Sequence, residues 1–370
     1  EGGLDKDGVI EIRRGVADLN LGKSHYAQVR IMVDDSHYLK GMAVYSDDIP
    51  EGYDVVFNTN KKSGTPKMKV LKPIKDDPDN PFGASIKANG QSTYIGEDGK
   101  EHLSPINKLK EEGDWDTMAK NLSSQFLSKQ PVKLLKQQLD LTIADRKAEY
   151  DEIMQYDNPT IRKKLLLDFA DTCEGNSMTL KASSFPGQAT KVILPLSKIG
   201  ERECYCPTYP DGTQLALVRF PHAGTFEIPI VTVNNKNLSG RRNLGNVQDA
   251  IGINAKVAER LSGADFDGDT VVAIPKSSKV DIKSTPALKD LKDFDPKIAY
   301  AVPEGNPNGV RLMKKEEKQK EMGIISNLIT DMTLRGAPEG DIARAVKHSM
   351  VVIDAEKHKL DYKRSERENG

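Results

Sequence analysis

Short apolar runs alternate with polar turns over residues 1–103, which predicts a β-rich domain. The runs with the clearest strand pattern are Tyr26–Val33, Met42–Tyr45 and Val55–Phe57. Turn-forming residues separate them, as in Ile49-Pro50-Glu51-Gly52. The stretch from Asp76 to Gly99 is rich in Pro, Gly, Asn and Asp, so we expect a loop there.

The pattern changes to helical spacing over residues 104–175. Apolar residues recur every three or four positions between Leu134 and Ala148, after a proline at position 131 that suits a first helical turn. Asn158-Pro159-Thr160 predicts the start of a second helix. We expect this segment to be a helical linker.

A second β-rich domain is expected over residues 176–275. Its best strands are Lys191–Leu196, Leu215–Phe220 and Thr270–Ile274. We expect one amphipathic helix, Val247–Leu261, to interrupt these strands. Residues 276–370 are predicted to be helical, with helices at Met322–Met332 and Gly340–Asp354 on either side of a break at 336–340.

Composition describes a soluble globular protein with an open choice of partner. The chain has 370 residues, 37% hydrophobic and 29% charged, and a formal net charge of −1. That balance argues against a simple basic coat for nucleic acid but is compatible with an enzyme that combines a basic channel and an acidic centre. No apolar stretch is long enough to cross a bilayer, so no membrane partner is expected. We expect the chain to be part of a longer polypeptide.

The three cysteines, Cys173, Cys204 and Cys206, lack the spacing of a zinc site or a disulfide framework. A reducing, cytoplasmic location is therefore expected.

The most informative segment is Asp265-Phe266-Asp267-Gly268-Asp269, where three carboxylates alternate between a predicted helix end and an apolar strand. Like charges this close repel unless a cation compensates them. A hard divalent ion such as Mg²⁺ is bound through oxygen ligands of this kind. Gly268 would let the loop curl so that the three side chains converge.

Two other interpretations of this loop are weaker. An EF-hand calcium loop requires Gly at its sixth position and Glu at its twelfth, where this chain has Thr270 and Lys276. A solvated acidic turn would not need the apolar strand that follows directly.

The aspartate loop resembles the metal-binding signature of the large catalytic subunit of multisubunit RNA polymerases. With Ser262-Gly263 before it, the loop is more similar still to single-chain, two-barrel RNA polymerases. That group includes the eukaryotic RNA-silencing polymerases and related bacteriophage enzymes. The resemblance implies that Asp265, Asp267 and Asp269 hold catalytic Mg²⁺.

Three further segments of the chain resemble this group. Together with the aspartate loop, they occur along the chain in the group's order. Arg219-Phe220-Pro221-His222 resembles an Arg-x-Pro segment, which implies that Arg219 binds the sugar of a nucleotide. Gln28-Val29-Arg30 and Lys40-Gly41 resemble a Gln-x-Arg and Lys-Gly pattern, which implies that Lys40 neutralises phosphate charge. Lys23 is a second candidate lysine by position. A Gly-x-Ile-x-Asn helix and a later apolar-Asp segment match through Asn327 and Asp354, whose roles stay open, as does that of His222.

The resemblance implies an α+β fold of two six-stranded double-psi β-barrels facing each other across a cleft, with the linker and the C-terminal helices beside them. It implies a nucleotidyltransferase in which an RNA 3′-hydroxyl attacks the α-phosphate of a nucleoside triphosphate. One Mg²⁺ would be held by the protein and a second would enter with the triphosphate. The expected catalytic residues are the three aspartates and Lys40; the expected substrate-binding residues are Arg219, Lys23 and Gly268.

The template is a further choice. We favour DNA because the chain is compact and its motif intervals differ from those of the longer eukaryotic enzymes, and a phage source would place the protein in the bacterial cytoplasm. The alternatives are an RNA-templated RNA polymerase, an archaeal-type two-barrel DNA polymerase, and a non-catalytic nucleic-acid-binding module.

Overall fold

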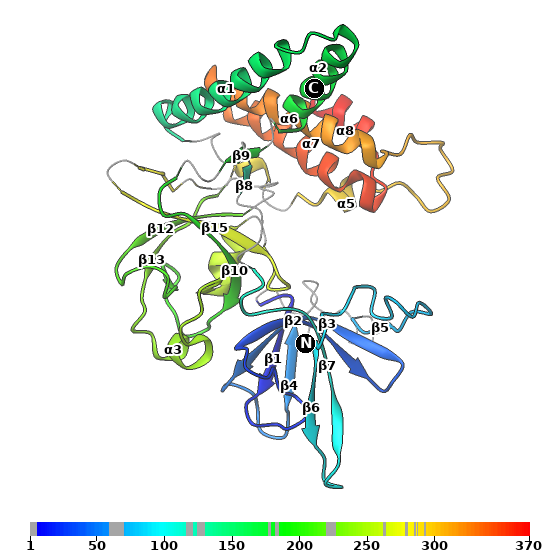
Figure 1. Ribbon diagram of the computed structural model, residues 1–370, viewed down its shortest axis with the longest axis vertical. Coiled ribbons are helices and arrows are strands. Elements are labelled where there is room, and N and C mark those ends of the chain that lie inside the picture. The colour runs from blue at the N-terminus through cyan, green and yellow to red at the C-terminus, as the bar shows by residue number, and fades with distance from the viewer. Residues whose placement is uncertain are drawn as a thin grey trace. The chain divides into compact units, whose positions relative to one another are not determined.

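The protein is described by a computed structural model with two compact units (Figure 1). The first comprises Glu1–Ala119, Ala189–Leu217 and Ile230–Pro275. The second comprises Lys120–Gln188, Val218–Pro229 and Lys276–Gly370. The residues described are 6–58, 70–115, 121–123, 130–176, 179–181, 185–219, 227–261, 264–277, 280–284, 286, 288–291 and 294–370.

The first unit begins with a seven-stranded sheet. Its strands are β1 (Val9–Arg13), β2 (Tyr26–Val33), β3 (His37–Ser46), β4 (Val55–Asn58), β5 (Lys72–Pro73), β6 (Gln91–Ile95) and β7 (Glu101–Glu111). They pair in the order β4-β1-β3-β2-β7-β6, and β5 pairs with the first two residues of β3. Among the described residues, no pairing closes this path into a barrel.

The remaining strands of the first unit form a closed six-stranded barrel. They are β10 (Ala189–Pro195), β11 (Glu203–Tyr205), β12 (Gln214–Arg219), β13 (Ile230–Val233), β14 (Ala250–Ile253) and β15 (Thr270–Pro275), with the order β10-β14-β11-β13-β12-β15. Two short helices connect them, α3 (Leu238–Leu244) and α4 (Ala255–Arg260). One predicted six-stranded barrel is therefore confirmed, and the other stays a prediction.

The sheet and the barrel share a four-strand arrangement. In the sheet, β1 pairs with β3 in parallel and with β4 in antiparallel orientation, and β2 is antiparallel to β3. In the barrel, β10 pairs with β14 in parallel and with β15 in antiparallel orientation, and β11 is antiparallel to β14. The two differ after this point, because β2 continues to an antiparallel β7 and β11 to a parallel β13.

Alternation along β2 and β3 gives the sheet two different faces. Val29, Ile31 and Leu39 lie on one face in the sheet's own core. Tyr26 and Met42 lie on the other face and share one continuous apolar cluster with barrel residues. Burial of a large apolar side chain contributes about 1.5–3 kcal/mol, so this cluster holds sheet and barrel together.

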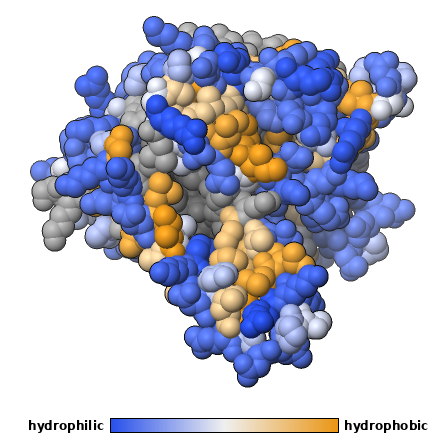
Figure 2. Space-filling model, turned by 90° about the horizontal axis from the view of Figure 1, so that it is seen from above, coloured by the Kyte–Doolittle hydropathy of each residue, from blue (hydrophilic) through white to orange (hydrophobic). Residues whose placement is uncertain are grey.

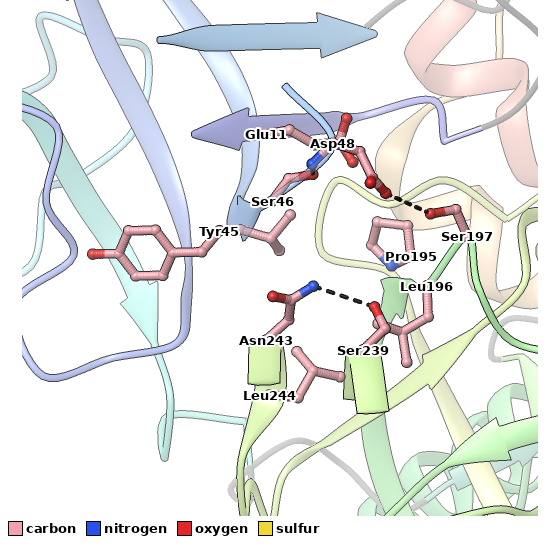
Figure 3. A pocket seen from close by; sticks show the side chains of 11 residues that line it. Glu11, Tyr45, Ser46, Asp48, Pro195, Leu196, Ser197, Ser239, Asn243 and Leu244 are labelled. Carbon is pink, nitrogen blue, oxygen red and sulfur yellow. Dashed lines mark hydrogen bonds between the residues drawn. The ribbon is translucent and has the colours of Figure 1, made fainter. Parts of the chain in front are cut away.

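A polar seam lies beside this apolar cluster (Figure 3). It includes Glu11, Ser46 and Asp48 from the sheet and Ser197, Ser239 and Asn243 from the barrel side. The pocket that these residues line has a volume of about 20 Å³, which is room for about one water molecule. It is therefore too small for a nucleotide.

The second unit is mainly helical. Its helices are α1 (Val132–Met154), α2 (Pro159–Asn176), α5 (Pro296–Ala299), α6 (Lys315–Leu334), α7 (Glu339–His358) and α8 (Tyr362–Asn369), with a 3-10 turn at Lys289–Leu291 and a two-stranded pair, β8 (Asn121–Ser123) and β9 (Thr179–Lys181). Ile329, Val346 and Val351 are among the residues of its apolar core. The predicted helices at 322–332 and 340–354 are confirmed as parts of α6 and α7.

Three boundaries differ from the sequence prediction. Residue 104 was expected to start the helical linker, but β7 continues to Glu111 and the first helix starts at Val132. The predicted helix over 247–261 is instead strand β14 followed by the short helix α4. The predicted loop over 76–99 contains β6. In each case a short apolar or polar run is compatible with more than one element, and tertiary pairing decides.

No helix in the described part of the chain is long and apolar enough to cross a membrane. Hydrophobic patches do interrupt the mostly hydrophilic surface in Figure 2. Large exposed apolar side chains in the second unit include Leu141 and Ile143 on α1 and Leu167 on α2.

Candidate active site

The aspartate loop joins α4 to β15 on the barrel. Phe266, only 1% exposed, anchors the loop in the apolar core between sheet and barrel. Asp267 next to it is exposed, and Asp265 and Asp269 are half-buried. The buried phenylalanine therefore fixes which way the neighbouring aspartates point.

The loop is closed by a hydrogen bond within it. The backbone N–H of Asp265 donates to a carboxylate oxygen of Asp269 at 2.9 Å. Gly268 has a φ of 118°, a conformation that favours glycine. A Cβ at Gly268 would also lie 2.7 Å from Nε2 of Gln28, so a larger residue fits neither the backbone nor the space.

The first sheet holds this loop at two points. The N–H of Phe266 donates to the carbonyl oxygen of Asp7 at 2.6 Å, and the Gln28 amide donates to the carbonyl oxygen of Asp267 at 2.8 Å. Both bonds go to the backbone of the loop.

Two glycines make this close approach possible. A Cβ at Gly8 would lie 2.7 Å from both the N and the Cβ of Asp267. A Cβ at Gly41 would lie 2.5 Å from the carbonyl oxygen of Gly8. The glycine of the Lys40-Gly41 pair therefore serves close packing of the N-terminal segment, which in turn lies against the aspartate loop.

Two cations lie on the face of the sheet that carries Gln28. Arg30 on β2 is paired directly opposite Lys40 on β3. Burial lowers the pKa of the Arg30 guanidinium, while Tyr38 and Asp267 act to raise it. Arg30 is thus close enough to Asp267 to interact with its charge, and Lys40 beside it is exposed.

Asp249 and Trp115 lie behind the aspartate loop: Asp249 binds the Trp115 backbone, and the Trp115 ring packs near Gly268. The buried Asp249 carboxylate accepts hydrogen bonds from the Tyr26 hydroxyl, from Gly113 N at 2.7 Å and from Trp115 N at 3.2 Å. The Trp115 ring is buried, and its Cη2 atom lies 3.2 Å from the position that a Cβ on Gly268 would take. Lys110 Nζ lies 4.8 Å from the centre of this ring. The Asp249 carboxylate therefore holds the segment that follows β7, whose Trp115 packs against Gly268 of the loop.

The other predicted residues are placed as follows. Lys23 is exposed in the turn before β2. Arg219 ends β12, is half-buried and belongs to the second compact unit, so its role toward the aspartates stays a prediction. His222 lies outside the described residues. Asn327 is exposed in the middle of α6 and Asp354 is half-buried on α7.

The residue types of the aspartate loop fit a hard divalent cation, since all three side chains offer carboxylate oxygens. That they hold one ion together stays a prediction. In the described part of the chain, no group of three or more His, Cys, Asp or Glu is arranged to hold a metal ion. One carboxylate, that of Asp269, is stabilised instead by the N–H of Asp265. The carboxylates of Asp265, Asp267 and Asp269 would be the ligands of such an ion.

The chain is similar in fold to a solved polymerase structure. This is the RNA dependent RNA polymerase QDE-1 from Thielavia terrestris, with a TM-score of 0.44 and 13% sequence identity. The likeness covers 100% of this chain and 47% of the other, so this chain spans about half the length of that protein. Neither the family models nor the curated proteins contain a match.

Several residues at the site carry no strong local signal. Gln28 and Arg30 belong to the Gln-x-Arg segment. Their alternation with the buried Val29 places both side chains on the same face of the sheet. Asp7, Trp115 and Asp249 reach the loop only through pairings between distant parts of the chain, which no local pattern indicates.

Proposed function

We propose that this chain is the catalytic core of a template-directed RNA polymerase, a nucleotidyltransferase that adds ribonucleotides to an RNA 3′ end. The observation that carries the proposal is the attachment of the aspartate loop to the first sheet through Asp7 and Gln28. Two further observations support the proposal: the charge of Asp267 acts on the pKa of Arg30, and Lys40 is paired opposite Arg30 on the neighbouring strand. Anionic ligands for a metal and cations for phosphates are the two requirements of phosphoryl transfer.

In the proposed reaction, the RNA 3′-oxygen forms a bond to the α-phosphorus and the bond from that phosphorus to the bridging oxygen of pyrophosphate breaks. The proton of the 3′-hydroxyl passes to solvent. Mg²⁺ held by Asp265, Asp267 and Asp269 would lower the pKa of the 3′-hydroxyl and offset phosphate charge, a second ion arriving with the triphosphate.

The protein's own groups would position the reactants. Lys40 and Arg30 would attract the phosphates, with Lys23 as a further candidate, and Arg219 would donate hydrogen bonds to the ribose. Gln28 and Gly268 would fix the loop backbone. Positioning and charge stabilisation then account for the rate, because no side chain forms a covalent intermediate.

The finer architecture is part of the same proposal. We infer two facing double-psi barrels, supported by the four-strand pairing that the first sheet shares with the closed barrel. DNA is the favoured template, because the intervals between the motifs differ from those of the longer eukaryotic enzymes. RNA is the alternative template.

A non-catalytic nucleic-acid-binding module is the second candidate. The observation that favours it is that, among the described residues, no group of three or more His, Cys, Asp or Glu is arranged to hold a metal ion. The two candidates differ in whether nucleotide addition occurs at all.

Primer extension separates them. Wild type, Asp267→Ala and the control Glu259→Ala, an exposed acid on α4, would be given Mg²⁺, labelled ribonucleotides and single-stranded DNA or RNA templates. We expect extension by wild type and Glu259→Ala and at least ~100-fold less by Asp267→Ala. Equal extension by Asp267→Ala, or Mg²⁺-independent extension, would contradict the proposed site.

A further inference from the structure

A row of cations continues from Gln28 along the same face of the first sheet. Arg30 and Lys40 are opposite each other on β2 and β3, and Lys72 on β5 is opposite Tyr38 on β3. We call Arg30, Lys40, Lys72 and Lys75 the cationic strip.

Lys75 belongs to this row because its side chain and the Tyr38 hydroxyl lie close to the same point, beside Gly83. Its Nζ lies 3.3 Å, and the Tyr38 hydroxyl 3.2 Å, from the position that a Cβ on Gly83 would take. Tyr38 is itself buried and packs edge-on against Phe82. Tyr38 and Phe82 are thus a buried aromatic pair, and the neighbouring Lys40, Lys72 and Lys75 are exposed.

Several other cations of the first unit are paired with carboxylates, whereas among the described residues of the strip only Arg30 lies near one, that of Asp267. Lys6 pairs with Glu11, and Lys87 and Lys108 both pair with Glu111. Within the part of the chain that the structure describes, none of the four strip residues forms an ion pair with a carboxylate. The nearby Asp77 accepts instead from the N–H groups of Asp79 and Asn80.

Like charges directly opposite on neighbouring strands destabilise a sheet, so the Arg30–Lys40 pair carries a cost that a bound anion would offset. The length of the row indicates the kind of anion. The row extends from Gln28, through Arg30, to the strand position shared by Tyr38 and Lys72. This is four residues along the strands, or roughly 13 Å. A single phosphate group reaches one level of this row, whereas a chain of phosphates reaches all of it.

We propose that the cationic strip binds the phosphate backbone of a nucleic-acid strand and leads that strand to the aspartate loop. The link to the loop rests on the proposed polymerase function. The binding itself needs neither metal nor catalysis, so it can be measured alone.

The test uses the double variant Lys72→Gln/Lys75→Gln, whose residues lie outside the proposed catalytic group. The control, Lys100→Gln/Lys256→Gln, removes two exposed lysines elsewhere in the first unit. Fluorescence anisotropy with labelled single-stranded RNA and DNA, in EDTA and over a range of salt concentrations, gives the affinity and its salt dependence. Thermal unfolding checks that both variants are folded.

Each phosphate contact on a single strand contributes about 0.7 to the slope of log K against log salt. We expect Lys72→Gln/Lys75→Gln to lower the slope by about 1.4, with weaker binding at low salt, and the control to match wild type. A wild-type slope and affinity in the double variant would overturn the proposal.

The two proposals fail separately. If wild type binds through the strip but does not extend primers, the polymerase function fails and the strip stands. If extension is normal and the double variant binds like wild type, only the strip fails.

Discussion

The side-chain amide of Gln28 donates a 2.8 Å hydrogen bond to the backbone carbonyl of Asp267, across 239 residues of sequence. The bond joins the first sheet to the loop on the barrel, and it fixes the backbone of that loop rather than a carboxylate. Gln28 thus provides a way to disturb the position of the aspartates without changing their charge.

Replacing Gln28 with Ala removes this attachment. One hydrogen bond contributes about 1 kcal/mol, so we expect primer extension to fall by about 5- to 10-fold with little change in the unfolding temperature. The control Gln214→Ala removes an exposed glutamine from β12. Equal rates for Gln28→Ala and Gln214→Ala would show that the attachment does not serve the site.

Gly8 and Gly15 offer a matched pair of substitutions. Both have a φ near 90°, at 90° and 88°, but a Cβ at Gly8 meets Asp267 whereas a Cβ at Gly15 meets nothing within 4 Å. Ala at either site incurs the backbone strain of about 1 kcal/mol, and only Gly8→Ala also forces the loop to move, at a further 1–3 kcal/mol. We expect Gly8→Ala alone to lose primer extension. If the two variants behave alike, contact with the loop has no functional effect.

Asp249→Ala tests the support below the loop. The substitution leaves the N–H groups of Gly113 and Trp115 buried without their acceptor, and we expect a loss of about 3 kcal/mol in the free energy of unfolding. Urea denaturation measures it. Asp54→Ala, which removes an exposed partner of Arg13, serves as control and should change stability little. A similar small change for Asp249→Ala would contradict the supporting role.

Glu111 gives a pH-dependent prediction. Burial acts to raise its pKa, but hydrogen bonds from Lys108, Lys87 and Ser24 outweigh this and lower it from 4.5 to about 2. A carboxylate with a lowered folded pKa stabilises the protein above its unfolded pKa, and that stability is lost as pH falls through about 2. Because the group is partly exposed, we expect Glu111→Gln to cost roughly 1–2 kcal/mol at pH 7.

Chemical denaturation of both proteins from pH 7 to pH 2 tests this prediction. The difference between wild type and Glu111→Gln should shrink over the acidic part of that range. A difference that stays constant with pH would mean that the glutamate acts through packing alone.

Local pattern predicted the elements that bury one clear face. The alternation in β2 and β3 and the apolar runs of β10 and β15 gave strands, and the long periodic segments gave α6 and α7. The run Ala250-Ile251-Gly252-Ile253 was assigned to a helix, because a fully buried strand and a buried helix look alike over four residues. Pairing with β10 and β11 decides for the strand.

The site was only partly predictable for a similar reason. Three carboxylates within five residues can be read directly from the sequence, and so can a lysine followed by a glycine. The contacts of Asp7, Gln28, Trp115 and Asp249 with distant segments depend on how the sheet and the barrel pack. The hydrogen bond from Asp265 N–H to Asp269 depends on the loop backbone, which the sequence pattern does not specify.

The central claim is that the aspartate loop holds a divalent cation. Mn²⁺ bound to the protein can be counted by electron paramagnetic resonance, in wild type, in Asp265→Asn/Asp267→Asn/Asp269→Asn and in the control Glu259→Gln. We predict a Mn²⁺ site in wild type and in the control that the triple variant lacks while remaining folded. If the triple variant binds as much Mn²⁺ with the same affinity, the aspartate loop is not the metal site.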